Sequence, residues 1–92
     1  MNKKRDHLEI IHDILNTIRR KAGLVRQTHI LYKSNLSHQM LVKYVGELIG
    51  KGFMIEKEDK KQKKYYELTD KGHQYLNDYK MIRGFVDSYG LG

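Results

Sequence analysis

The chain contains no cysteine and no long uninterrupted apolar run. Without cysteine there is neither a disulfide framework nor a thiolate metal site, which suits a reducing compartment. No apolar stretch approaches the roughly 18 residues of a membrane-spanning helix. Residues 1–6 are mostly charged and lead into an amphipathic pattern rather than the apolar block of a signal peptide. These absences predict a soluble cytoplasmic protein with no membrane partner.

Arrangements typical of enzymes are also lacking. The sequence has no glycine-rich phosphate loop, and no nucleophile accompanied by a base and an orienting group. His7 and His12 are five residues apart, so on a helix their side chains would point about 140° apart and would not share a metal ion. We therefore expect no catalytic residue, no metal site, no cofactor and no small-molecule ligand.

The positive charge is concentrated in the middle of the chain. The 92 residues suffice for one domain with a modest core that oligomerisation would help to stabilise, and they carry a net charge of +7. Residues 1–18 sum to zero, residues 19–64 to +8 and residues 65–92 to −1. A basic middle between balanced ends indicates a surface that binds a polyanion.

The first half of the chain has the pattern of helices joined by short connections. Apolar residues at three- and four-residue steps predict a helix over residues 6–22, with Gly23 as its stop. Residues 24–26 are expected to be extended and to supply a third strand to a small sheet. Thr28 is expected to cap a short helix that breaks at residues 34–35, and so short a turn before the next helix predicts a steep crossing.

The next helix is expected to begin after Ser37, whose hydroxyl can cap it, and to end at residues 50–52, where glycine allows a left-handed stop. At 100° per residue it has a buried face and an open face without acidic groups, which suits a helix that enters a DNA major groove. The buried face comprises Leu41, Tyr44, Val45 and Leu48, and the open face comprises Gln39, Lys43, Gly46 and Gly50.

After Gly52 the apolar period changes to two, which predicts a hairpin of residues 53–58 and 64–68 with a polar tip at residues 59–63. Lysines at a hairpin tip can simply be solvated and protect a sheet edge. Because these lysines follow a helix-turn-helix whose second helix has an open face without acidic groups, we favour a role in binding phosphates.

A last helix, capped by Thr69, is predicted over residues 70–89. Its apolar side chains recur at steps of three and four, and twenty residues span about 30 Å, more than so small a domain needs. Part of this face should pack on the first helix, and the remainder should form a dimer contact. The expected dimer residues are Tyr75, Tyr79, Ile82, Phe85, Val86 and Tyr89.

Three passages resemble the winged helix-turn-helix DNA-binding proteins. Residues 52–55, 65–72 and 75–76 resemble the passage from wing to last helix, and residues 36–39 with 41–44 resemble the start of the recognition helix in an archaeal branch. That branch includes ten-kilodalton chromatin-associated proteins that dimerise through an antiparallel coiled coil of the last helix. Because residues 85–91 are similar too, the resemblance covers essentially the whole chain.

The resemblance implies an α+β fold, mainly α: a winged-helix DNA-binding domain over residues 1–69 and a dimerisation arm over residues 70–92. It implies a homodimer that binds duplex DNA in the cytoplasm, at the nucleoid, as a transcriptional regulator or chromatin component. A winged-helix module that binds other proteins of the transcription machinery is the main alternative, and RNA binding is a third. The expected DNA contacts are Arg26, Thr28, Ser37, His38, Gln39, Lys43, Lys60, Lys61, Lys63 and Lys64.

Overall fold

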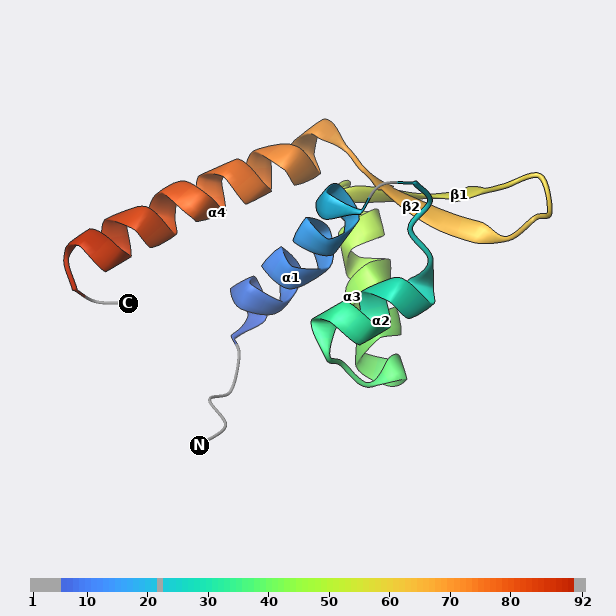
Figure 1. Ribbon diagram of the computed structural model, residues 1–92, viewed down its shortest axis with the longest axis horizontal. Coiled ribbons are helices and arrows are strands. Elements are labelled where there is room, and N and C mark those ends of the chain that lie inside the picture. The colour runs from blue at the N-terminus through green and yellow to red at the C-terminus, as the bar shows by residue number, and fades with distance from the viewer. Residues whose placement is uncertain (1–5, 22, 91–92) are drawn as a thin grey trace.

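The computed structural model describes residues 6–21 and 23–90. Three helices form the centre, a hairpin projects from one side, and the last helix extends on the other (Figure 1), within dimensions of 49 × 31 × 24 Å. This confirms the predicted winged helix of the α+β class, mainly α. The elements are α1 (His7–Arg20), α2 (Gln27–Ser34), α3 (His38–Gly50), β1 (Met54–Glu58), β2 (Lys64–Leu68) and α4 (Asp70–Ser88).

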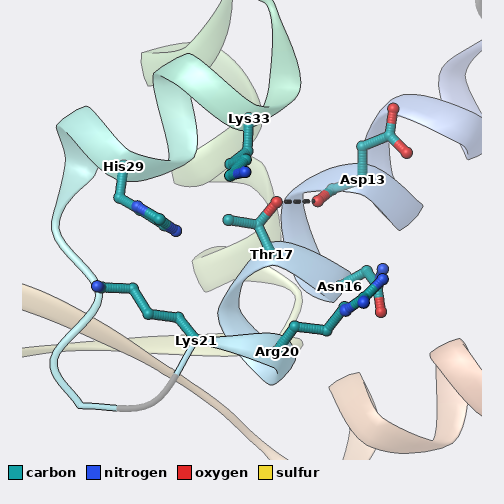
Figure 2. A pocket seen from close by; sticks show the side chains of 7 residues that line it. All are labelled: Asp13, Asn16, Thr17, Arg20, Lys21, His29 and Lys33. Atoms are coloured by element: carbon teal, nitrogen blue, oxygen red, sulfur yellow. Dashed lines mark hydrogen bonds between the residues drawn. The ribbon is translucent and has the colours of Figure 1, made fainter.

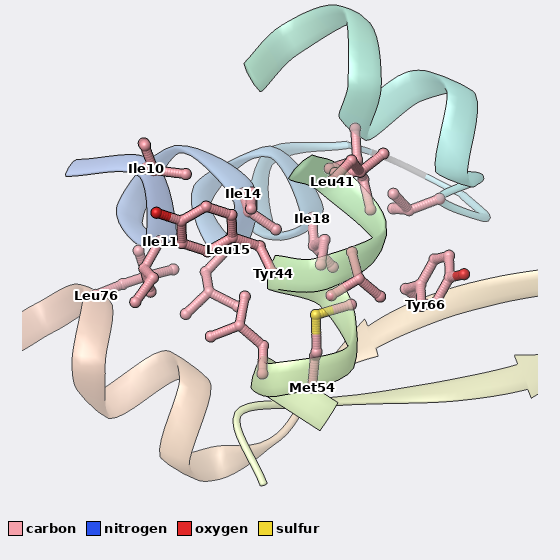
Figure 3. Packing of buried hydrophobic residues seen from close by; sticks show 14 residues of the cluster. Ile10, Ile11, Ile14, Leu15, Ile18, Leu41, Tyr44, Met54, Tyr66 and Leu76 are labelled. Carbon is pink, nitrogen blue, oxygen red and sulfur yellow. The ribbon is translucent and has the colours of Figure 1, made fainter. Parts of the chain in front are cut away.

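One hydrophobic core joins all six elements (Figure 3). Helix α1 contributes the largest share because its apolar residues recur at helical spacing, and the helix packs mainly on α2, α4 and β2. Among the described residues, none lies in a helix long and apolar enough to cross a membrane. The largest fully buried hydrophobic side chains are Ile14, Leu15, Ile30, Leu41, Leu48 and Met54.

Helix α3 follows the prediction closely. The Ser37 hydroxyl accepts a hydrogen bond from the Met40 amide at 3.2 Å, which caps the helix. Gly52 has a φ of +82°, so it supplies the left-handed residue that turns the chain towards β1. The predicted inward face is buried, comprising Leu41, Tyr44, Val45 and Leu48.

The end of α1 and the start of α2 differ from the prediction. Helix α1 ends at Arg20 because Lys21 is already extended, so Gly23, although its φ is +90°, is not the helix stop. Ala22, the expected last residue of this helix, lies outside the described residues. The early exit lets Val25 pair with Tyr66 of β2 through a single bridge, so the expected third strand is one residue long.

Thr28 does not cap α2. The cap position is Arg26, two residues earlier, and its side chain makes no capping hydrogen bond. Because the bridge to Tyr66 holds Val25 extended, the chain enters the helix at Gln27, and Thr28 lies within the first turn. The predicted break is confirmed at Asn35, whose φ of +54° ends α2 in the left-handed conformation.

Strands β1 and β2 pair antiparallel, with Met54 opposite Leu68 and Glu58 opposite Lys64. Met54 points into the core, whereas Ile55 is exposed. Only the first residue of β1 is buried, so most of the hairpin stands clear of the core as a wing (Figure 1).

The first turn of α4 is seated on the segment that follows α3. The Thr69 hydroxyl donates to the Gly52 carbonyl at 2.6 Å and accepts from the Gly72 amide at 3.1 Å. The Lys71 ammonium donates to the Lys51 carbonyl at 2.8 Å and lies 4.6 Å from the centroid of the Phe53 ring. Together these interactions of Thr69 and Lys71 set the direction in which α4 leaves the domain.

Gly72 is buried in this joint, and a Cβ there would overlap the Phe53 carbonyl oxygen. We expect Gly72→Ala to lower the free energy of unfolding by about 1–3 kcal/mol, the usual cost of overpacking. Gly46→Ala is the matched control because a Cβ there meets nothing within 4 Å, and it should gain about 1 kcal/mol of helix propensity. Urea denaturation measures both, and equal stabilities would contradict the predicted clash.

Candidate nucleic-acid interface

The open face of α3 is the first part of the candidate interface. Ser37 and His38 lie at its amino end, and Gln39, Lys43 and Gly46 follow along the helix. Side chains of this kind can donate to and accept from base edges, while the bare Gly46 leaves room for close approach. The geometry is therefore that of a helix able to enter a groove.

Two apolar side chains on this face were not predicted as site residues. Met40 is 41% exposed and Val42 is 49% exposed, and neither belongs to the core. Val42 lies one turn after Gln39 on the helix surface, where a methyl group could contact a thymine methyl. The sequence alone could have indicated this exposure, because Val42 does not belong to the predicted buried face of the helix.

The single carboxylate of α3 is neutralised by its neighbours. Glu47 accepts from the Lys51 ammonium at 3.1 Å, and this hydrogen bond holds the pKa of Glu47 below its ordinary value. The His7 Nε2 atom lies 3.6 Å from the same Glu47 oxygen, and its Nδ1 atom lies 3.2 Å from the Tyr44 hydroxyl. The amino end of α1 thus meets α3, and the Glu47 carboxylate is surrounded by His7, Lys51 and the nearby Lys43 of the open face.

The tip of the wing presents lysines on an ordered turn. The Asp59 Oδ1 atom accepts from the backbone amides of Lys61 at 2.8 Å and Lys63 at 3.0 Å, and Gln62 has a φ of +62°. The side chains of Lys60, Lys61 and Lys63 are exposed and make no hydrogen bond or ion pair within residues 6–21 and 23–90. The three ammonium groups are therefore available to an anionic partner.

Arg26, an expected DNA contact, holds the wing tip instead of projecting freely. Its Nη2 atom donates to the Asp59 Oδ2 atom at 2.6 Å, and its Nη1 atom donates to the carbonyls of Lys63 at 3.2 Å and Lys64 at 3.1 Å. The guanidinium beside Asp59 holds the pKa of that carboxyl below its ordinary value. A residue just before α2 thereby fixes a turn that lies far along the chain.

The flanks of the wing are balanced by cross-strand ion pairs. The Lys57 ammonium lies 2.9 Å from the Glu67 carboxylate, which raises the pKa of Lys57. The Lys64 ammonium lies 3.7 Å from Glu56, so this predicted DNA contact has a partner within the wing. The unbalanced positive charge is thus concentrated at the tip.

The predicted DNA contacts gather in three places. Arg26 and Thr28 lie at the start of α2, the second group lies at the amino end of α3, and the third lies on the wing. Arg26 is partly buried in its contacts with the wing, whereas the lysines of the wing group are exposed. The α3 group comprises Ser37, His38, Gln39 and Lys43, and the wing group comprises Lys60, Lys61, Lys63 and Lys64.

Helix α4 divides the predicted dimer residues into two groups. Tyr75 donates its hydroxyl to the Leu8 carbonyl at 2.9 Å, and burial raises the pKa of Tyr75 to about 12. Tyr79 stacks on His12 with ring centroids 4.2 Å apart. Beyond Tyr79 the helix leaves α1 (Figure 1), and Ile82 and Phe85 are each 60% exposed. The far end of the helix also carries Val86, which is half-buried, and the exposed Tyr89.

A groove of about 310 Å³ runs between the start of α1 and α4. Its apolar lining comes from Leu8 on one side and from Tyr75, Tyr79, Ile82 and Val86 on the other. The predicted seam therefore forms one wall of a groove that continues onto the free part of α4.

A second concave region lies on the outer side of α1 and α2, and we call it the α1–α2 pocket (Figure 2). No metal-binding group of three or more histidine or acidic side chains occurs in the part of the chain that the structure describes. The α1–α2 pocket is lined by Asp13, Asn16, Thr17, Arg20, Lys21, His29 and Lys33.

Comparison with known proteins supports the same fold. The chain is similar to the DNA-binding protein Sso10a-2 from Sulfolobus solfataricus, with 27% identity and a TM-score of 0.71 over 94% of this chain and 90% of that one. A MarR-family transcriptional regulator from Rhodococcus matches with 22% identity and a TM-score of 0.67, over 77% of this chain and 51% of that one. MepR, a transcription regulator of a Staphylococcus aureus multidrug efflux pump, matches with 15% identity and a TM-score of 0.76, over 88% and 60%.

The two regulators share the fold with this chain, which spans between half and two thirds of their length. None of the curated proteins matches it in sequence. The model of the winged helix-turn-helix family matches residues 4–86, which is most of the chain. The protein therefore belongs to the winged helix-turn-helix family.

Proposed function

We propose that this protein binds duplex DNA, with α3 in the major groove and the wing on the backbone. The observation that carries the proposal is the availability of its cations: the ammonium groups of Lys60, Lys61 and Lys63 have no acidic partner among the described residues. The one acidic group of α3, Glu47, is paired with Lys51. The open face of α3 therefore offers hydrogen-bond donors and acceptors with little repulsion of phosphate. The DNA-binding neighbour of similar length supports the same assignment.

The two alternatives require a different surface chemistry. A winged helix that binds a protein should present an apolar or acidic face on α3. This face instead carries the polar Gln39 and Lys43, with Met40 and Val42 as its only exposed large apolar side chains among the described residues of α3. An RNA-binding surface should offer exposed aromatic rings for stacking, and neither the wing tip nor the open face of α3 has one. Mobility shifts with duplex DNA, single strands and structured RNA separate the three functions.

We further propose that the protein acts as a homodimer, in the cytoplasm and at the nucleoid, with residues 70–92 as its dimerisation arm. The exposed apolar side chains beyond Tyr79 form a continuous stripe with the groove beside α1, which a second α4 could cover. Both a regulator and a chromatin component fit this arrangement. A footprint over genomic DNA distinguishes them, since one protected palindrome indicates a regulator and diffuse protection a chromatin protein.

The wing lysines should contribute sequence-independent affinity. Replacing Lys60, Lys61 and Lys63 with Ala should weaken binding to all duplexes alike and reduce the slope of log K against log salt by about 0.9 for each phosphate that is no longer neutralised. Mobility shifts or anisotropy at several salt concentrations measure the slope. Lys80→Ala, an exposed lysine on α4, is the control and should leave it unchanged. An unaltered slope in the triple variant would remove the wing from the interface.

Asp59→Asn tests whether Arg26 acts by positioning the wing. Asn retains an oxygen for the two turn amides but removes the charge that holds the guanidinium. We expect duplex affinity to fall by up to about tenfold, an effect comparable with leaving one or two phosphates without a cation. Glu58→Gln is the matched control, because it removes the same charge from the neighbouring residue and should slightly strengthen binding.

If Asp59→Asn also strengthens binding, then Arg26 is not a clamp and the wing does not depend on it. The sign is informative because simple electrostatics predicts the opposite result: removing a carboxylate beside DNA should favour the complex. The pKa of Asp59 is below its ordinary value, so its charge persists at neutral pH and disappears only as the pH falls through that lowered value.

Ile82→Glu should convert the proposed dimer into a monomer. Ile82 lies on the free part of α4 at the middle of the stripe, and an unpaired charge buried there costs about 3 kcal/mol or more, about two orders of magnitude in the dimer dissociation constant. Sedimentation measures the mass, and circular dichroism should show unchanged helix content because Ile82 is exposed in the single chain. Tyr32→Glu, an exposed aromatic on α2, is the control. A wild-type protein that sediments at 10.9 kDa would overturn the dimer.

A further inference from the structure

The α1–α2 pocket gathers positive charge from two helices. Arg20 and Lys21 come from the end of α1, and His29 and Lys33 come from successive turns of α2 (Figure 2). None of these four side chains makes a hydrogen bond or ion pair with another described residue. They surround a space of about 540 Å³, within the usual range for small-ligand sites.

One carboxylate lines the pocket, and it does not balance these cations. Asp13 lies 3.5 Å from the His12 Nδ1 atom, which places another partner beside its carboxylate. The Thr17 hydroxyl donates to the Asp13 carbonyl at 2.7 Å, so it contributes an oxygen that is already satisfied as a donor. Three permanent cations and one imidazole therefore line the cavity with one acidic group, which leaves an excess of positive charge in its lining.

The lining selects the class of ligand. Ligand sites of this volume are usually apolar, whereas every side chain here can form hydrogen bonds. An arginine fork pairs with two oxygens at once, and lysines act as point charges, a combination suited to phosphate. Three permanent charges on the lining of one concave region favour a multiply charged anion over a single carboxylate.

We propose that the α1–α2 pocket binds a phosphate-bearing ligand through Arg20, Lys21 and Lys33, with His29 as a further donor. The phosphate can come from a free polyphosphate compound or from the backbone of a nucleic acid, and the chemistry of recognition is the same. The proposal does not rest on duplex binding by α3 and the wing, because it uses none of their residues. It adds a second anion site to a chain in which residue spacing alone indicates no ligand pocket.

The test is a titration of the isotope-labelled full chain with sodium pyrophosphate, followed by two-dimensional amide NMR at constant ionic strength. We expect saturable shifts centred on the amides of Arg20, Lys21 and His29. Arg20→Gln with Lys33→Gln should weaken this binding at least tenfold. Lys60→Gln with Lys61→Gln removes the same charge from the wing and should leave the pocket shifts unchanged.

Shifts that do not saturate, that centre on the wing, or that fall equally in both double variants would overturn the proposal. The wild-type shift map tests the site even if a variant fails to fold. A short duplex added to the pyrophosphate complex identifies the source of the phosphate. Displacement from the pocket residues would assign the site to the nucleic-acid backbone, and retention would assign it to a free phosphate compound.

Discussion

The contact between the first turn of α4 and residues 51–53 is the one on which the rest of the structure depends. Thr69 caps α4 and donates to Gly52, while Gly72 approaches the Phe53 carbonyl so closely that no side chain fits between them. The same few residues end α3, begin β1 and set the direction of α4. Because backbone meets backbone here, the joint has little freedom to relax, and three elements are oriented together.

A second long-range contact coordinates the two parts of the proposed interface. Arg26 ends the linker before α2 and donates to three acceptors at the wing tip, so the turn bearing the lysines is tied to the helix-turn-helix. An isolated two-stranded hairpin is at best marginally stable in water. The wing is therefore presented to a partner in a fixed orientation relative to α3, which lowers the ordering cost of binding.

The features that the sequence predicted correctly are those that depend on residues close together in the chain. Ser37 and Thr69 act as caps, and the inward face of α3 follows from spacing alone. Thr28 failed as a cap because the Val25–Tyr66 bridge, between residues far apart in sequence, sets where α2 begins. The Arg26–Asp59 pair arises in the same way, from distant segments meeting, so residue spacing could not indicate it. The exposure of the α3 open face and of the wing lysines was expected. The contact of Arg26 with Asp59, which ties the wing to the helix-turn-helix, was not.

The free part of α4 has a consequence for how this architecture can vary. Since Ile82, Phe85 and Tyr89 are exposed and no described residue beyond Tyr79 belongs to the hydrophobic core, changes in helix length there should leave the core packing unchanged. Each residue adds about 1.5 Å and 100° of rotation, so inserting seven residues lengthens the arm by about 10 Å and nearly restores its facing direction. In the proposed two-fold dimer, the length of α4 would set the distance between the two winged-helix domains without any change to those domains.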